Sequence, residues 1–449
     1  MKRLGTMTRE TFASMHVRNF RLFFTGQLVS QVGNWLTLIA QTLLVFQLTH
    51  SGVAVGLLSA AQFGPVLLIG PWAGLVADRS DKRRLLLIVQ VIAMAQSFTL
   101  AALAFSGHPP VLAVYAVAFV GGVTVAFDNP ARRAFVVEMV PEDSITNAVS
   151  LNSALMTCAR VVGPVLAGVL VATVGFGWCF VADALSYIAV LVGLWMIRTS
   201  ELHPSPVAAR AKGQVRAGLR YARSVPELWV PLVMMAVIGT LSYNFPVVLL
   251  LFAERSLEGT STTYTLLYAT ISVGSLIGAL AAARRVSITV RIVAMAAIAF
   301  GSMMAILTFV PSKALAYPIC LCVGIASMTF MTASTAIVQI RSDAEMRGRV
   351  LALQAMVFLG STPIGGPIVG WICQRYGARY GLAVGALAAL GAGLWGLSTV
   401  RAARAARAGA FETASPVAPA EAAEFVADAT AELSEDLPPE LAFPRPSEL

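Results

Sequence analysis

Charged residues are scarce in this chain of 449 residues: they make up 12% of it, about half of the share that is typical of a soluble globular protein. Hydrophobic residues reach 57%, and the mean hydropathy is +0.76. So few charges do not suffice to cover a water-exposed surface of this size. The composition therefore excludes an ordinary soluble enzyme.

Cysteine and histidine are also rare, with five and four residues respectively. The cysteines lie inside apolar runs without a C-x-x-C spacing, so neither a disulfide framework nor a zinc site is predicted. The histidines form no pair at i and i+4. We therefore expect no metal, no cofactor and no catalytic residues, and the predicted protein is not an enzyme.

Long apolar runs are the dominant feature of the sequence. Each is about 20 residues long, enough to cross a bilayer and too long for the core of a signal peptide, so no cleaved targeting segment is expected. The predicted fold class is an all-α membrane protein with twelve transmembrane helices, at residues 22–48, 53–77, 85–105, 111–128, 147–174, 178–197, 229–252, 263–283, 288–309, 314–335, 349–373 and 380–399.

Positive charge is distributed unevenly between the connecting segments. The net charge is +9, although residues 412–449 carry nine acids and one base. If the N-terminus is cytoplasmic, 26 of the 32 Lys and Arg residues fall on the cytoplasmic side, as the positive-inside rule requires. We therefore expect a multi-pass protein of the cell inner (plasma) membrane with both termini in the cytoplasm, and a bilayer with anionic headgroups as a partner. Nucleic acid is not an expected partner.

The two halves of the chain resemble each other at a fixed offset. Gly163-Pro164 with Gly168 recurs as Gly366-Pro367 with Gly370. A parallel repeat is typical of a secondary transporter with two bundles and a site between them. The predicted parts are a cytoplasmic N-terminal segment 1–21, a six-helix bundle 22–197, a cytoplasmic linker 198–228, a second six-helix bundle 229–399 and a disordered acidic cytoplasmic tail 400–449.

The segment from Gly74 to Arg84, between the second and third spans, resembles the conserved loop of the major facilitator superfamily. The stretches Ser30–Trp35, Asp128–Glu138 and Arg347–Leu353 are similar to its drug- and siderophore-exporting branch, which includes the enterobactin exporter. The resemblance covers residues 18–400 and implies the major facilitator fold and transport by alternating access.

The resemblance also implies a conformational latch on the cytoplasmic side. In the family the acid of this loop docks at the start of span 11, and the second basic position pairs with an acid at the inner end of span 4. This chain has Asp81 where Gly is common and Lys82 where Arg is common, so a point charge replaces a bidentate fork. The predicted latch residues are Gly74, Asp78, Arg79, Lys82, Arg83, Asp128 and Gly348.

The repeated Gly-Pro segments form the second candidate feature. Proline bends a helix and glycine permits close approach of a neighbour, so a tight seam between bundles is expected. In the superfamily this pattern resembles a span 5 motif of antiporters, although Ala167 replaces its first closing Gly; an ordinary packing kink is the alternative. The seam residues are Gly163, Pro164, Gly168, Gly366, Pro367 and Gly370.

Polar residues recur at helical spacing within several spans. In span 1 six of them fall within about 120° of one another, which predicts a face that lines water; hydrogen bonding between helices is the alternative for any single member. The predicted cavity residues are Gln27, Gln31, Asn34, Gln41, Thr157, Arg160, Tyr243, Asn244, Thr332 and Thr335, and Ser30 and Thr37 complete the stripe of span 1.

Ionisable residues within spans are functional candidates because charge in hydrocarbon is costly. Arg160 lies near the middle of span 5, where it could attract an anionic group of a substrate. Asp183 and Asp128 are the candidates for proton coupling. The helical rise places Asp183 nearer the outer surface than Arg160, which argues against a direct pair. A carboxylate hydrated in an outer vestibule is the alternative for Asp183.

Together these features predict a monomeric secondary active transporter that exports a small amphipathic molecule, drug-like or siderophore-like, by alternating access and proton antiport. A facilitator-type importer of a small solute is the alternative within transport. A non-transporting membrane sensor or scaffold on the same fold is the alternative outside it, because fold does not fix function.

Overall fold

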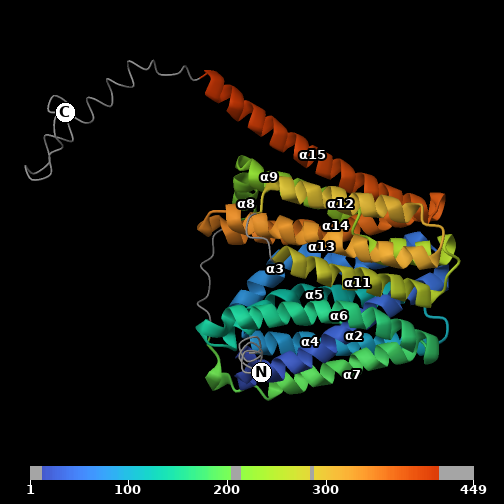
Figure 1. Ribbon diagram of the computed structural model, residues 1–449. Coiled ribbons are helices and arrows are strands. Elements are labelled where there is room, and N and C mark those ends of the chain that lie inside the picture. The colour runs from blue at the N-terminus through green and yellow to red at the C-terminus, as the bar shows by residue number, and fades with distance from the viewer. Residues whose placement is uncertain (1–12, 204–213, 284–287, 414–449) are drawn as a thin grey trace, which may run out of the picture. The chain divides into compact units, whose positions relative to one another are not determined.

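The computed structural model describes residues 13–203, 214–283 and 288–413 (Figure 1). All regular secondary structure within these ranges is helical. Twelve segments among the described residues are long and apolar enough to cross a membrane. The predicted fold class and the predicted number of spans are therefore confirmed.

The first half of the chain supplies six long helices, which are drawn from blue to green in Figure 1. Short 3-10 helices, Ala13–His16, Glu142–Ser144 and Thr199–Glu201, flank them. The six spans are α2 (Arg18–Thr49), α3 (Gly52–Arg79), α4 (Lys82–Phe105), α5 (Val111–Glu138), α6 (Ile145–Thr173) and α7 (Phe176–Trp195).

The second half begins with a short helix, α8 (Gln214–Ser224), and continues with six further spans. The first of these spans is discontinuous and consists of α9 (Pro226–Leu241), α10 (Phe245–Leu251) and a π-helix (Phe252–Ser256). The others are α11 (Ser261–Ala283), α12 (Val290–Thr308), α13 (Lys313–Arg341), α14 (Ala344–Tyr376) and α15 (Ala378–Thr413).

Helix boundaries follow from local sequence. The Asp81 carboxylate caps α4 by accepting a hydrogen bond from the backbone N–H of Arg84 at 3.0 Å, so this departure from the family pattern has a structural role. Gly175 and Gly377 join consecutive spans with φ angles of 86° and 106°. These values lie where a side chain would introduce strain.

Two predicted boundaries are wrong. α5 does not end at Asp128 but continues to Glu138, and α15 continues through the first part of the predicted disordered tail to Thr413. The extension of α15 is rich in Ala and Arg, which have high helix propensity. The segments 1–12, 204–213 and 414–449, on which the predictions for the two tails and the middle of the linker fall, lie outside the described residues.

Both bundles belong to one structural unit that ends at Leu397, and a second unit begins at Ser398. Within the first unit, the halves meet mainly through two helix pairs, α3 with α14 and α6 with α11. The sequence repeat relates span 5 to span 11, and at nearly the same offset Gly70 and Gly74 of span 2 correspond to Gly274 and Gly278 of span 8. The two pairs are therefore equivalent under the repeat, as expected for two related bundles around a common axis.

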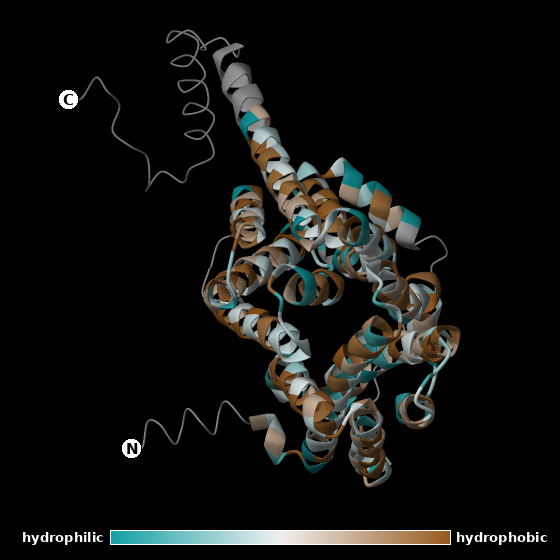
Figure 2. Ribbon diagram, turned by 90° about the vertical axis from the view of Figure 1, so that its right-hand side faces the viewer, coloured by the Kyte–Doolittle hydropathy of each residue, from teal (hydrophilic) through white to brown (hydrophobic). Residues whose placement is uncertain are grey.

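Large apolar side chains cover the outside of this unit. Leu68, Leu112 and Leu387 are 74%, 78% and 68% exposed, and Figure 2 shows hydrophobic segments on many of the helices. Surfaces of this kind are stable when hydrocarbon surrounds them. The charged residues concentrate at helix ends, and the end where α2 begins and α3 finishes is called the basic end below.

Candidate functional site

The two bundles approach most closely away from the basic end. A Cβ at Gly56 would lie 2.4 Å from the carbonyl oxygen of Gly366, and a Cβ at Gly370 would lie 2.3 Å from that of Gly52. Each helix thus presents a Gly-x-x-x-Gly pair to the other, which allows the backbones of α3 and α14 to touch. The backbone N–H of Gly52 also donates to Oε1 of Gln374 at 2.7 Å.

A second contact closes the same end between α6 and α11. A Cβ at Gly168 would lie 2.3 Å from the Thr265 hydroxyl oxygen. Nearby, a guanidinium nitrogen of Arg255 donates to the carbonyl oxygen of His50 at 2.6 Å, which joins the second bundle to the end of α2. Gly168, Gly366 and Gly370 therefore lie at contacts between the bundles.

Gly163 has a different position from the one predicted. A Cβ there would lie 2.4 Å from Cβ of Trp35 on α2, so Gly163 packs within its own bundle. The reason is geometric: Gly163 and Gly168 are five residues apart and therefore project in directions that differ by about 140° on α6. Gly52 and Gly56 complete the seam instead, and their Gly-x-x-x-Gly spacing was a signal visible in the sequence.

The predicted latch at the basic end is not engaged in this structure. Asp78 is exposed, and a Cβ added at Gly74 or Gly348 would have no neighbouring atom within 4 Å. The close contacts between α3 and α14 reach at least to Leu67, whose Cδ1 would lie 2.3 Å from a Cβ at Gly360. The start of α14 therefore does not cover Asp78.

The predicted pair between Lys82 and Asp128 is wrong. Nζ of Lys82 lies 2.7 Å from Oε1 of Glu138, and both side chains are largely buried. Asp128 is ten residues, about 15 Å of helix, further into the bundle, because α5 extends to Glu138. Glu138, at the end of the segment Asp128–Glu138, is therefore the acid that pairs with Lys82.

Arg83 of the predicted latch has a separate role. Its guanidinium donates to the carbonyl oxygens of Leu194 and Trp195 at 2.7 and 2.9 Å. These are the last residues of α7, whose carbonyls have no partners within the helix. Arg83 therefore fixes the basic end of α7 to the start of α4, whereas Arg79 is exposed in the last turn of α3.

The polar stripe of span 1 faces the interior of the first bundle. The side chain of Gln31 donates to Gln27 at 3.2 Å, and that of Gln62 on α3 donates to Gln41 at 2.8 Å. The prediction that this face lines water is therefore wrong for Gln27, Ser30 and Gln31, which are buried. Thr37 and Gln41 form hydrogen bonds with side chains of neighbouring helices, as the alternative proposed. The exposed fractions are 1% for Gln27, 0% for Ser30, 8% for Gln31, 7% for Thr37 and 2% for Gln41.

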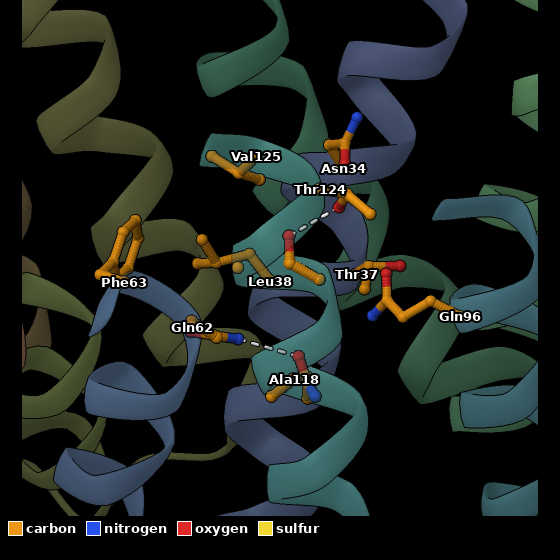
Figure 3. A pocket seen from close by; sticks show the side chains of 12 residues that line it. Asn34, Thr37, Leu38, Gln62, Phe63, Gln96, Ala118, Thr124 and Val125 are labelled. Atoms are coloured by element: carbon orange, nitrogen blue, oxygen red, sulfur yellow. Dashed lines mark hydrogen bonds between the residues drawn. The ribbon is translucent and has the colours of Figure 1, made fainter. Parts of the chain in front are cut away.

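A small polar cavity accompanies this stripe, between α2, α3, α4 and α5 (Figure 3). Its volume is about 90 Å³, enough for several water molecules. The polar side chains that line it are Asn34, Thr37, Gln41, Gln62, Gln96 and Thr124.

The break between α9 and α10 places polar groups at the junction of the bundles. The hydroxyl of Tyr243 donates to the carbonyl oxygen of Ser327 at 2.6 Å, and Nδ2 of Asn244 donates to that of Thr240 at 2.6 Å. Discontinuous helices of this kind commonly form transporter binding sites. Asn244 itself is 1% exposed, and Thr332 and Thr335 are partly exposed on α13.

Arg160 lies at the same junction, on the polar face of α6 that also carries Ser153 and Thr157. Its guanidinium stacks over the ring of Trp35, with 5.2 Å between the carbon and the ring centroid. The ring of Tyr268 on α11, in the second bundle, lies 6.4 Å from that of Trp35, measured between the ring centroids. Two bundles therefore converge on this one cation.

Asp183 is buried on the opposite side of α2. It is 1% exposed and accepts hydrogen bonds on Oδ2 from the hydroxyl groups of Thr37 and Ser97, both at 2.7 Å. Its other oxygen is buried without a hydrogen-bond partner. The alternative of a carboxylate hydrated in an outer vestibule is therefore wrong, and Ser97 on α4 is a contact that the sequence analysis missed.

Asp183 and Arg160 form no ion pair. Their neighbours on α2, Thr37 and Trp35, are two residues apart and so project about 200° apart around the helix axis. The body of α2 therefore separates the anion from the cation. The direction of the side chains, rather than the depth used in the sequence argument, accounts for the separation.

Asp128 differs from Asp183 because it has a cationic partner. Nε of Arg132 lies 3.1 Å from its Oδ2, and Nε2 of Gln90 donates to its Oδ1 at 2.8 Å. The charge of Asp128 is thus compensated within α5. Of the two candidate carboxylates, Asp183 is the one without a compensating cation among the described residues.

Thiol labelling tests which polar faces are open. Single cysteines at Gln31 and Gln41, in a protein without the native cysteines, are expected to resist a water-soluble maleimide because these positions are 8% and 2% exposed. A cysteine at Ser153, which is exposed on α6, is expected to react at least about tenfold faster, since only an accessible thiol forms the reactive thiolate readily. Equal rates at the three positions would contradict this assignment of faces.

Comparison with known proteins agrees with this architecture. A family model described as "Transmembrane secretion effector" matches residues 9–424. Macrolide efflux protein A of Streptococcus pyogenes is 23% identical over 371 residues, which cover 80% of this chain and 91% of that protein.

The staphyloferrin A transporter of Staphylococcus aureus is 32% identical over 176 residues, which are 39% of this chain and 44% of that protein. The chain thus spans less than half of the length of this relative. Among solved structures, a bacterial homolog of the human lysosomal transporter Spinster, in an inward-facing and occupied conformation, superposes with a TM-score of 0.68 at 14% identity. The match covers 87% of this chain and 97% of that one, and it supports the fold.

Proposed function

Because the chain belongs to the transmembrane secretion effector family of the major facilitator superfamily, we propose that it exports a small amphipathic molecule, drug-like or siderophore-like, by alternating access coupled to proton antiport. Because this family consists of membrane transporters, the protein is a multi-pass transporter of the plasma membrane and not an enzyme. The observation that carries the proposal is the asymmetric contact between the bundles, which touch at one end while the latch at the other end is open.

The open end supports an inward-facing state. Lys and Arg concentrate at the basic end, which the positive-inside rule assigns to the cytoplasm. Asp78, Gly74 and Gly348 lie there without the contacts of a closed latch. In the outward-facing state the start of α14 moves onto Asp78 while the glycine seam between α3 and α14 separates.

The relatives support export, and the seam supports antiport. One relative is named for macrolide efflux and another for transport of staphyloferrin A. The Gly-Pro segments that resemble an antiporter motif place Gly168, Gly366 and Gly370 at the bundle contacts. Glycines at these positions allow the helix backbones of the two bundles to touch in one state and to separate in the other.

Asp183 is the proposed proton carrier. A carboxylate buried in a span is costly unless it is paired or protonated. Asp128 has Arg132 as a partner, whereas Asp183 has only the hydroxyl groups of Thr37 and Ser97. The small polar cavity beside Thr37 and Asn34 lies in the same bundle and offers water a place near this carboxylate.

Anionic headgroups are the proposed lipid partners at the cytoplasmic surface. Arg216, Arg220 and Arg223 lie exposed on α8 at spacings of four and three residues, on one face of that helix. Arg223 stacks over Trp229 with 5.3 Å to the ring centroid. A basic amphipathic helix beside an aromatic residue is suited to the membrane interface.

Counterflow in proteoliposomes tests the proposed function. Purified protein is reconstituted with unlabelled staphyloferrin A or a macrolide inside, and entry of the labelled compound is followed with and without an imposed pH gradient. We expect labelled compound to accumulate transiently by exchange, and to accumulate further when the trans side is acidic. Protein-free liposomes are the control. Counterflow that the pH gradient does not change would contradict proton antiport, and no counterflow would exclude these substrates.

A further inference from the structure

Arg160 is partly exposed and has no anionic partner at a depth in the membrane where an unpaired charge is costly. Among the described residues it forms no ion pair and no hydrogen bond, and its Nε is buried without a partner. It lies 15 residues from the basic end of the 29-residue helix α6, near the middle of the membrane. Arg132, which lies buried in the same bundle, differs because Asp128 compensates its charge.

The surroundings of Arg160 are aromatic and come from both bundles. Trp35 lies under the guanidinium on α2, and the ring of Tyr268 on α11 is 6.4 Å from that of Trp35. Tyr264 and Tyr268 pack edge to face with 6.1 Å between their centroids, and the Tyr264 hydroxyl is buried without a hydrogen-bond partner. Tyr243, at the break before α10, packs edge to face against Phe358 of α14 with 5.2 Å between the centroids.

We propose that Arg160 binds an anionic group of the transported molecule, a carboxylate or a similar oxyanion, while Trp35 and Tyr268 contact an adjacent flat apolar part. The inference rests on the proposed function and specifies its substrate class as organic anions with an aromatic or otherwise flat portion. A guanidinium binds oxyanions through paired N–H donors. Electrostatic attraction between unit charges is stronger near a protein surface than in bulk water.

The position of the site links substrate binding to alternating access. Arg160 and Trp35 belong to the first bundle and Tyr268 to the second, so a molecule held by these three residues contacts both moving parts. The proposed proton carrier Asp183 is on the other side of α2. The substrate anion and the Asp183 carboxylate therefore do not compete for one cation, and α2 contacts both sites.

Charge-selective thiol labelling tests for the anion site without requiring transport. Thr157→Cys is introduced into a protein lacking the native cysteines and reconstituted in nanodiscs. Its reaction rates are measured with methanethiosulfonates carrying an anionic sulfonate or a cationic trimethylammonium group. Thr157 precedes Arg160 by one helical turn, so the anionic-to-cationic rate ratio is expected to fall about tenfold in Arg160→Gln. Arg160→Lys, which retains the charge, is the matched control and should keep most of the ratio.

Protection by small ligands tests the substrate class in the same samples. Benzoate is expected to slow the labelling of Cys at Thr157 when Arg160 is present and not in Arg160→Gln, whereas benzamide, its neutral counterpart, should protect neither. An unchanged rate ratio in Arg160→Gln, or equal protection by benzoate and benzamide, would overturn the proposal. Equal protection by sulfate and benzoate would overturn the aromatic part and leave a site for inorganic anions. Because labelling needs no transport, these results are independent of the counterflow experiment.

Discussion

Asp183→Asn is expected to abolish substrate accumulation driven by a pH gradient while exchange at equal pH continues. The carboxylate is 1% exposed and is held by the hydroxyl groups of Thr37 and Ser97. Asn has nearly the same shape but cannot carry a proton. A gradient of one pH unit stores about 1.4 kcal/mol per proton, so one-for-one antiport supports about tenfold accumulation. For Asp183→Asn, the ratio of the substrate concentration inside the vesicles to that outside should be about one.

The measurement uses everted membrane vesicles that are acidified inside, with uptake of labelled substrate followed over time. Asp143→Asn is the matched control, because Asp143 is an exposed acid in the segment Glu142–Ser144 before α6. Full accumulation by Asp183→Asn would remove this residue as the proton carrier and leave Asp128 or a proton carried by the substrate. Loss of exchange as well as accumulation would instead indicate that Asp183 supports the packing of α2, α4 and α7.

Asp78→Asn is expected to reduce transport about tenfold or more at normal abundance in the membrane. In this structure Asp78 is exposed and the start of α14 does not cover it, so its partner is formed in the other conformation. A carboxylate at a helix N-terminus contributes up to about 2 kcal/mol in a partly buried geometry. Its loss depopulates the closed-inside conformation by more than tenfold.

Asp81→Asn provides a matched control three residues away. Asn caps a helix as well as Asp does, so the hydrogen bond to the N–H of Arg84 is retained and transport should be unchanged. Labelling of a cysteine at Ser153 gives a second readout, because a protein that remains inward-facing keeps this position accessible. Wild-type transport and labelling by Asp78→Asn would show that no latch operates at this residue.

Periodicity and charge determined the architecture from the sequence alone. A run of about 20 apolar residues has one stable solution in a bilayer, a helix that satisfies its own backbone groups. The number of spans was therefore predictable, and the structure agrees with it. The repeated Gly-Pro segments likewise indicated a two-bundle fold, because an internal repeat appears directly in the sequence.

Side-chain direction and the pairing of distant residues were decided only by the tertiary structure. The sequence shows that span 1 has a polar face, but the neighbouring helices determine whether that face contacts water or the side chains of α3 and α7. In the structure Gln31 and Gln41 are buried. From the sequence alone, Lys82 could pair with either Asp128 or Glu138. The length of α5 decides between them, because it places Glu138 at the basic end, where Lys82 lies.

The same limit applies to the ionisable residues of the core. The sequence identified Arg160 and Asp183 as candidates because charges in apolar spans are costly and therefore rare. The sequence could not show that α2 lies between them. Trp35 and Thr37 point to opposite sides of α2, but only the structure shows that Arg160 of α6 lies on one side and Asp183 of α7 on the other. Composition and periodicity are properties of a single helix and are visible in the sequence. A binding site forms where several helices meet, so it depends on how the helices pack.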